Sequence, residues 1–115
     1  MTTMLTYTLA VQAFEDRDYN AAVDRFTEVL AEDPHNRTVR EYLARALYHR
    51  ASLKPAEAEL RTLLAEDPCN EYAALLLTRT LERQSRHDEA AGVRRMLAAL
   101  TGDAGHLGRH AAGVA

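Results

Sequence analysis

The sequence predicts an all-α protein made of a repeated pair of helices. The segment 30–36 recurs at 64–70 with six of its seven residues unchanged, which sets a repeat period of 34 residues. Residues 1–101 contain a single glycine, which favours helices over a protein of strands and turns. Apolar residues also recur at helical spacing within each repeat. We therefore expect six helices in three antiparallel pairs, and no strand of more than a few residues within 3–101.

The first helix of each repeat carries a leucine followed by a small residue. Rows 3–36, 37–70 and 71–101 place these pairs at Leu9-Ala10, Leu43-Ala44 and Leu77-Thr78. The small residue allows the two helices of one repeat to approach closely. We expect Leu9, Leu43 and Leu77 to be buried at equivalent positions of equivalent helices.

The second helix of each repeat pairs an alanine with a residue four positions later. The pairs are Ala22 with Phe26, Ala56 with Leu60, and Ala90 with Arg94. Phe26 and Leu60 are expected to fill the core beside the alanines. Arg94 departs from this pattern, and we interpret it as part of the polar outer face that a terminal repeat presents to solvent.

Polar residues mark where the helices begin and end. The predicted N-caps are Asp18 and Ser52 for second helices, and Asn36 and Asn70 for the first helices that follow. Pro34 and Pro68 each stand two residues before such an asparagine, so they are predicted to lie in the turns between repeats.

Composition limits the class and compartment of the protein. The formal net charge of −3 argues against a general nucleic-acid binder. Thirteen of the fourteen basic residues are arginine, and alanine is abundant, which indicates a GC-rich, bacterial genome. Cys69 is the only cysteine, so no intramolecular disulfide is expected and the cytoplasm is the simplest compartment. We find no secretory signal pattern and no apolar run near the ~20 residues that span a bilayer.

The sequence offers no pattern typical of catalysis or metal binding. His106 and His110 are four residues apart, but two histidines alone do not complete a metal site. Cys69 lies in a predicted turn without a neighbour that would activate its thiol. We predict neither an enzyme nor a protein that holds a cofactor or metal.

These markers together resemble the tetratricopeptide repeat (TPR) family, whose 34-residue unit carries leucine and a small residue, then Ala-x3-Phe, then proline. The resemblance covers 3–101 and implies a right-handed superhelical array of three helix-turn-helix repeats. Thr6 and Ala13 stand where the family often has Trp and Tyr. The glycine-rich tail 102–115 is expected to be disordered, with at most one marginal turn.

In this family the first helices line a concave groove that holds a partner peptide. The residues that the register places in such a groove are Tyr7, Val11, Phe14, Glu15, Glu41, Arg45, Tyr48, His49, Tyr72, Leu75, Arg79, Glu82 and Arg83. Some members clamp the C-terminal carboxylate of a chaperone with Lys and Asn in their first helix. Tyr7 and Val11 occupy those places here, so the clamp is not expected.

The resemblance implies a protein–protein interaction module that binds a peptide or helix as an adaptor or regulatory subunit. The alternative is a structural module that dimerises through its repeat ends, where Met96, Leu97 and Leu100 lie. RNA binding is a remote alternative, because helical repeats that bind RNA need a basic face.

We further hypothesise that the groove prefers an acidic peptide. Arg79 is the expected anchor, supported by Arg45 and Arg83, with Tyr48 and Tyr72 beside them. The competing interpretation of Arg45 is an ion pair with Glu41, four residues earlier on the same helix.

Overall fold

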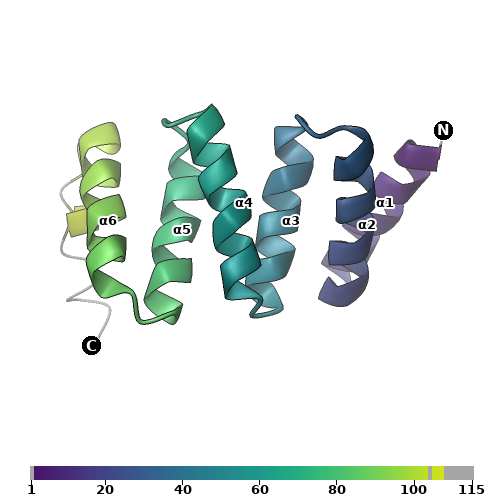
Figure 1. Ribbon diagram of the computed structural model, residues 1–115, viewed down its shortest axis with the longest axis horizontal. Helices are drawn as coiled ribbons and strands as arrows, with labels where there is room; N and C mark the ends of the chain where they lie inside the picture. Colours follow the sequence, from purple (N-terminus) through teal and green to yellow (C-terminus); the bar gives the residue numbers. More distant parts are fainter. Residues whose placement is uncertain (1, 104, 108–115) are drawn as a thin grey trace. The chain divides into compact units, whose positions relative to one another are not determined.

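A computed structural model, drawn in Figure 1, describes residues 2–103 and 105–107 of the chain. Its helices are α1 (Thr2–Glu15), α2 (Tyr19–Glu32), α3 (Arg37–His49), α4 (Leu53–Glu66), α5 (Glu71–Arg83) and α6 (His87–Thr101). Each has 13 to 15 residues, and no strand occurs in the part of the chain that the structure describes. The all-α prediction and its six helices are confirmed. None of the described helices has the length and apolarity needed to cross a bilayer.

The helices belong to two compact units, Met1–Glu59 and Leu60–Ala115. In the first unit α1 packs against α2, and α2 packs against α3. In the second unit α5 packs against α6. Helix α4 begins in the first unit and ends in the second, because the boundary lies between Glu59 and Leu60.

The core of the first unit follows the predicted register. Phe26, Ala22 and Ala10 have no exposed surface, and Leu43 is 4% exposed. The aromatic ring thus fills the volume that the small residues leave, as the spacing of the sequence required. The second unit repeats the arrangement with Leu60, Leu63, Ala73, Leu77, Leu81, Ala90 and Leu97, all of which are buried.

Three of the four predicted caps, Asp18, Asn36 and Asn70, bind the helix starts as expected, whereas the hydroxyl oxygen of Ser52 accepts a hydrogen bond from Nε of Arg50 (3.0 Å). The side-chain oxygen of Asn36 accepts a hydrogen bond from the N–H of Val39 (3.1 Å), and Asn70 does the same for Ala73 (3.0 Å). Asp18 accepts from the N–H of Ala21 (3.2 Å). Pro34 and Pro68 lie in the turns between helix pairs, where their missing N–H groups break no helical hydrogen bond.

The turn inside each helix pair contains one residue in the left-handed conformation. Arg17, Ala51 and Ser85 have φ of 62°, 64° and 61°, and they are spaced by the 34-residue period. The next N–H in each turn donates to a carbonyl five residues earlier: Asp18 to Ala13, Ser52 to Leu47, and Arg86 to Leu81 (2.8, 2.8 and 2.9 Å). This pattern closes the helix C-termini as a glycine usually would, although no glycine stands at these positions.

Two predictions of side-chain exposure, those for Leu9 and Arg94, were wrong. Leu9 is 40% exposed, whereas its counterparts Leu43 and Leu77 are 4% and 2% exposed. Leu9 differs because no described element covers its side of α1, where Leu5, one helical turn earlier, is also exposed (59%).

Arg94 was expected on a polar outer face, but it is only 3% exposed and forms an ion pair with Glu82. Its register position, shared with Phe26 and Leu60, directs the side chain into the contact between α5 and α6. Burial lowers the pKa of its guanidinium. The structure has no hydrogen-bond partner for its Nε among the described residues.

The predicted tail falls largely outside the described residues, which include only 102, 103 and 105–107 of it. Residues 105–107 form one helical turn. His110 lies outside the described residues.

Candidate functional site

An aromatic cluster joins the three helices of the first unit around Tyr42 of α3. The ring of Tyr42 stacks on Phe26 of α2, with centroids 5.0 Å apart and an interplanar angle of 10°. It also meets Tyr7 and Phe14 of α1 edge to face, at 6.3 and 5.5 Å. Such pairs contribute ~0.5–1.5 kcal/mol each beyond the area they bury. Tyr42 therefore fixes α3 against both helices of the first repeat.

A second group of rings continues the cluster toward the other end of α1. Phe14 meets Tyr19 edge to face with centroids 5.6 Å apart. Tyr19 in turn stacks on His49 of α3 at 5.0 Å and 20°. The sequence positions these rings by helical spacing, because Tyr7 and Phe14 are seven residues apart on α1, as are Tyr42 and His49 on α3. Residues at that spacing share one helix face.

Arg45 is the cation of this cluster. Its guanidinium carbon lies 4.8 Å from the centroid of Phe14 and 5.4 Å from that of Tyr42. A cation over aromatic faces gains ~0.5–1 kcal/mol at an exposed site and more when desolvated. Arg45 is half-buried, so its position is held while part of the side chain stays in contact with solvent. The N–H groups at the edge of the plane suit a carboxylate that approaches from outside.

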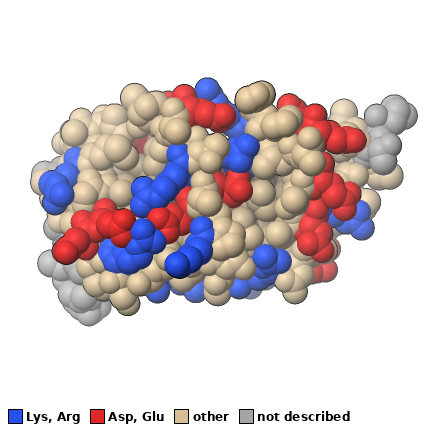
Figure 2. Space-filling model, in the orientation of Figure 1, with Lys and Arg blue, Asp and Glu red and all other residues tan. Residues whose placement is uncertain are grey.

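The charges of the first repeat begin at the C-terminal end of α1. Row 3–36 holds seven acidic residues and two arginines, yet residues 2–14 of α1 carry no charge. On the face seen in Figure 2, acidic side chains gather over α2, where Asp24, Glu28 and Glu32 are exposed. Residues 2–14 of α1 are therefore a neutral segment, and Arg45 of α3 lies over the ring of its Phe14.

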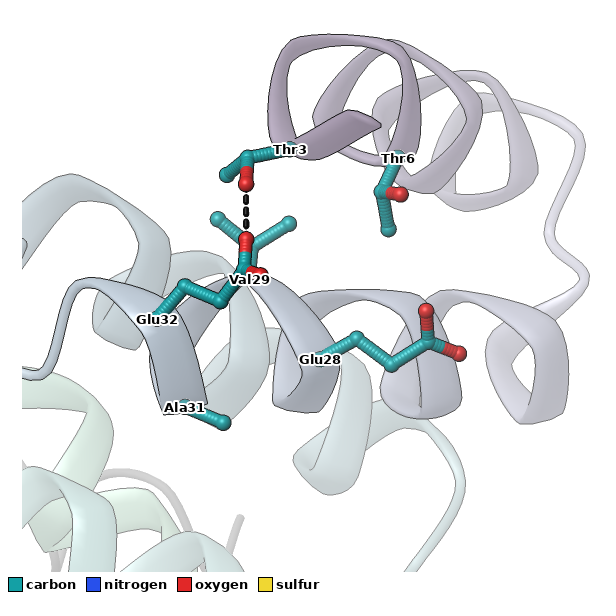
Figure 3. A pocket seen from close by; sticks show the side chains of 6 residues that line it. All are labelled: Thr3, Thr6, Glu28, Val29, Ala31 and Glu32. Atoms are coloured by element: carbon teal, nitrogen blue, oxygen red, sulfur yellow. Dashed lines mark hydrogen bonds between the residues drawn. The ribbon is translucent and has the colours of Figure 1, made fainter. Parts of the chain in front are cut away.

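A separate cleft of about 340 Å³ opens between α1 and α2 (Figure 3). Thr3 and Thr6 project into it from α1, and Glu28 and Glu32 from α2. The hydroxyl of Thr3 donates a hydrogen bond to Glu32 across the cleft. This contact ties the first turn of α1 to the last turn of α2.

The structure brings together the predicted residues of the first unit. The aromatic cluster includes Tyr7, Phe14, Arg45 and His49. Tyr48 meets His49 edge to face, with ring centroids 5.7 Å apart. The other predicted residues of this unit, Val11 and Glu41, are half-buried on α1 and α3, and Glu15 is exposed.

The predicted residues of the second unit all belong to α5. Tyr72 is 43% exposed, Arg79 and Arg83 are exposed, and Leu75 is half-buried. Glu82, the remaining predicted residue, is half-buried, and its carboxylate lies against Arg94 of α6.

Sequence reasoning missed Tyr42 and Tyr19. Tyr42 lies three residues before Arg45 on the same helix face, so its spacing from Arg45 was the available signal. Tyr19 opens a second helix and had no such signal. The rings under Arg45 are Phe14 and Tyr42, both contributed by first helices.

The described residues show no group of three or more histidine, cysteine or acidic side chains that could hold a metal ion. Cys69 is an exposed free thiol in the turn before α5.

Helix pairs that repeat every 34 residues, with the same left-handed turn in each pair, define a helical-repeat protein. The model of the tetratricopeptide repeat family matches residues 13–79. This chain therefore belongs to the tetratricopeptide repeat family. No curated protein sequence matches it.

Solved structures of TPR proteins share the fold. The crystal structure of MamA superposes with a TM-score of 0.83 at 14% identity, covering 97% of this chain and 69% of MamA. A mutant of MamA gives 0.81 at 21% identity, with 86% and 72% covered. The first TPR of Spaghetti (RPAP3), bound to the HSP90 peptide SRMEEVD, gives 0.79 at 16% identity, with 97% and 94% covered. These structures show that the chain has the TPR fold.

Proposed function

We propose that this protein binds an acidic segment of a partner protein and acts as an adaptor or regulatory subunit in the cytoplasm. The observation that carries the proposal is the position of Arg45 over Phe14 and Tyr42. Two rings hold the guanidinium in one orientation, so less side-chain entropy is lost when a carboxylate binds its edge.

The distribution of charge also supports an acidic ligand. Residues 2–14 of α1 include no acidic residue, so this helix adds no repulsion against an acidic segment over that length. Arg79 and Arg83 offer two further exposed cations on α5 of the second unit. The relative of the same fold that holds SRMEEVD binds a peptide with three acidic side chains. In this chain Tyr7 and Val11 replace the Lys and Asn of the family's carboxylate clamp, so side-chain carboxylates are the proposed ligands.

Selection from a random dodecapeptide library tests the proposal. We expect Asp and Glu to be enriched in peptides recovered on the wild-type chain, and the enrichment to fall on Arg45→Ala. Arg25→Ala is the matched control, because Arg25 is also a half-buried arginine of the first unit but lies on α2. Equal enrichment on Arg45→Ala and wild type, or no acidic enrichment at all, would overturn the proposal.

Self-association is the second candidate, supported by the exposed apolar side of α1. Met4, Leu5 and Leu9 are 72%, 59% and 40% exposed on one helix. Light scattering coupled to size-exclusion chromatography distinguishes the adaptor from the self-associating module. A monomer at all concentrations supports the adaptor. A dimer that dissociates on Leu9→Asp supports self-association.

A further inference from the structure

A depression of about 400 Å³ lies beside the aromatic cluster, lined by Thr3, Met4, Tyr7 and Asn36. It shares Tyr7 with the cluster, and Tyr7 contacts Tyr42, one of the two rings beneath Arg45. The depression and the guanidinium are thus two parts of one continuous surface, formed by α1, α3 and the turn before α3.

Two polar side chains of this depression, those of Thr3 and Asn36, form hydrogen bonds within the protein. The hydroxyl of Thr3 donates to Glu32, so it points to the α2 side. The amide oxygen of Asn36 accepts from the N–H of Val39 (3.1 Å), and its nitrogen donates to Asp33 (3.1 Å). The other two side chains that a ligand can contact there are Tyr7 and the exposed Met4. A surface formed by a thioether and an aromatic side chain favours an apolar ligand side chain over a charged one.

The distance between the two parts sets a spacing in the ligand. Tyr7 and Phe14 are seven residues apart on α1, which corresponds to ~10.5 Å along the helix axis. A segment in the polyproline II conformation advances ~3.1 Å per residue and repeats its side-chain direction every three residues. Side chains three positions apart therefore point the same way and span ~9 Å, close to the axial separation of Tyr7, which lines the depression, and Phe14, which lies under Arg45.

We propose that the partner segment is extended and carries a large aliphatic residue three positions from an acidic residue. The aliphatic side chain occupies the depression at Met4 and Tyr7, and the carboxylate binds Arg45. This inference rests on the proposed function, because Arg45 supplies the second of its two contacts. It adds the chemistry and spacing that distinguish this ligand from acidic segments in general.

Titration of the ¹⁵N-labelled full chain by NMR tests the inference with defined probes. The probes are blocked decapeptides of Gly and Ser that carry one Leu and one Glu. The Leu stands two, three or five positions from the Glu, and a fourth peptide has Ser in place of Leu. We expect the three-position peptide to bind at least about threefold more tightly than the other spacings, with shifts at Tyr7 and Tyr42.

Two substitutions on α1 form the matched pair for this experiment. Met4→Asn should weaken the three-position peptide about fivefold and leave the Leu-free peptide unchanged. Leu5→Asn should change neither, because Leu5 is an equally accessible aliphatic residue that does not line the depression. Both positions are exposed, so folding is expected to persist in each variant.

The outcomes separate this inference from the proposed function. Peptides that bind equally at all spacings, yet lose affinity with Arg45→Ala, would overturn the inference and leave the proposed function standing. Tighter binding by a helical peptide with Leu and Glu seven positions apart would also overturn it. If no acidic peptide binds, both proposals fail.

Discussion

The guanidinium of Arg94 lies against the carboxylate of Glu82 at the two positions where the first repeat has Phe26 and Phe14. An ion pair thus stands in the third repeat where aromatic side chains stand in the first. Arg94 is 3% exposed, whereas 28% of the Glu82 side chain is exposed, so desolvation falls mainly on the arginine. The pKa of Arg94 is lowered for the same reason, because burial makes the charged guanidinium less stable in the folded protein than in water.

This asymmetry predicts different costs for removing each partner. Glu82→Ala leaves Arg94 buried without its counter-charge, and we expect a loss of about 3 kcal/mol in the free energy of unfolding. Arg94→Leu leaves only a carboxylate that reaches solvent, and restores the residue type that the second repeat has at Leu60, so its cost should be below about 1 kcal/mol. Urea denaturation measures both. If Arg94→Leu destabilises the chain as much as Glu82→Ala, the ion pair is a net stabilising contact.

The left-handed turns offer a stabilising substitution. Ala51 has φ of 64°, a conformation that costs a non-glycine residue ~1–2 kcal/mol and costs glycine almost nothing. We expect Ala51→Gly to raise the free energy of unfolding by about 0.5–1 kcal/mol. Ala58→Gly is the control, because Ala58 is an exposed alanine inside α4, where glycine should cost about 1 kcal/mol. Thermal melts of the two variants should therefore shift in opposite directions, and a drop for Ala51→Gly would contradict the assignment of the turn.

The third prediction compares two leucines at one repeat position. Leu43→Ala removes a side chain that is 4% exposed and should cost about 2–5 kcal/mol. Leu9→Ala removes the same atoms from a side chain that is 40% exposed and should cost less than about 1 kcal/mol. Phe26→Ala, at a fully buried ring stacked on Tyr42, should cost about 3–5 kcal/mol. Similar losses for Leu9 and Leu43 would mean that the exposed side of α1 is covered in solution.

The sequence alone predicted the features that depend on local spacing. The caps Asn36 and Asn70 and the burial of Phe26 follow from side chains that act within one or two turns of helix. Register also predicted which residues are equivalent across repeats. It did not predict their exposure, because that depends on what covers each helix. Leu9 has the same repeat position as Leu43, but no described helix packs over it. Arg94 is buried despite its charge.

The candidate site was predictable only in part, for a related reason. Tyr7, Phe14 and Arg45 were identified because groove positions follow from the repeat register. The role of Tyr42 depends on contacts between different helices, with Phe26 of α2 and Phe14 of α1. A single sequence carries no direct signal for such pairs.

The last prediction concerns how Arg45 binds its ligand. For an acidic peptide recovered from the library, Arg45→Ala should weaken binding at least about fivefold, and Arg45→Lys should recover only part of the loss. Lysine keeps the charge but lacks the planar group that lies on Phe14 and Tyr42 and offers paired N–H donors. Fluorescence anisotropy at low and high salt measures both variants, and the affinity of the wild type should fall as salt rises.

Arg79→Ala provides the comparison within the same titration. Arg79 is exposed on α5, so its loss should leave thermal stability nearly unchanged and weaken binding through charge. Its effect should therefore shrink as salt rises, whereas part of the Arg45 effect should persist, because two rings hold that guanidinium in place. Full recovery by Arg45→Lys would show that charge alone matters at this position, and binding by both alanine variants at the wild-type level would place the partner on another face.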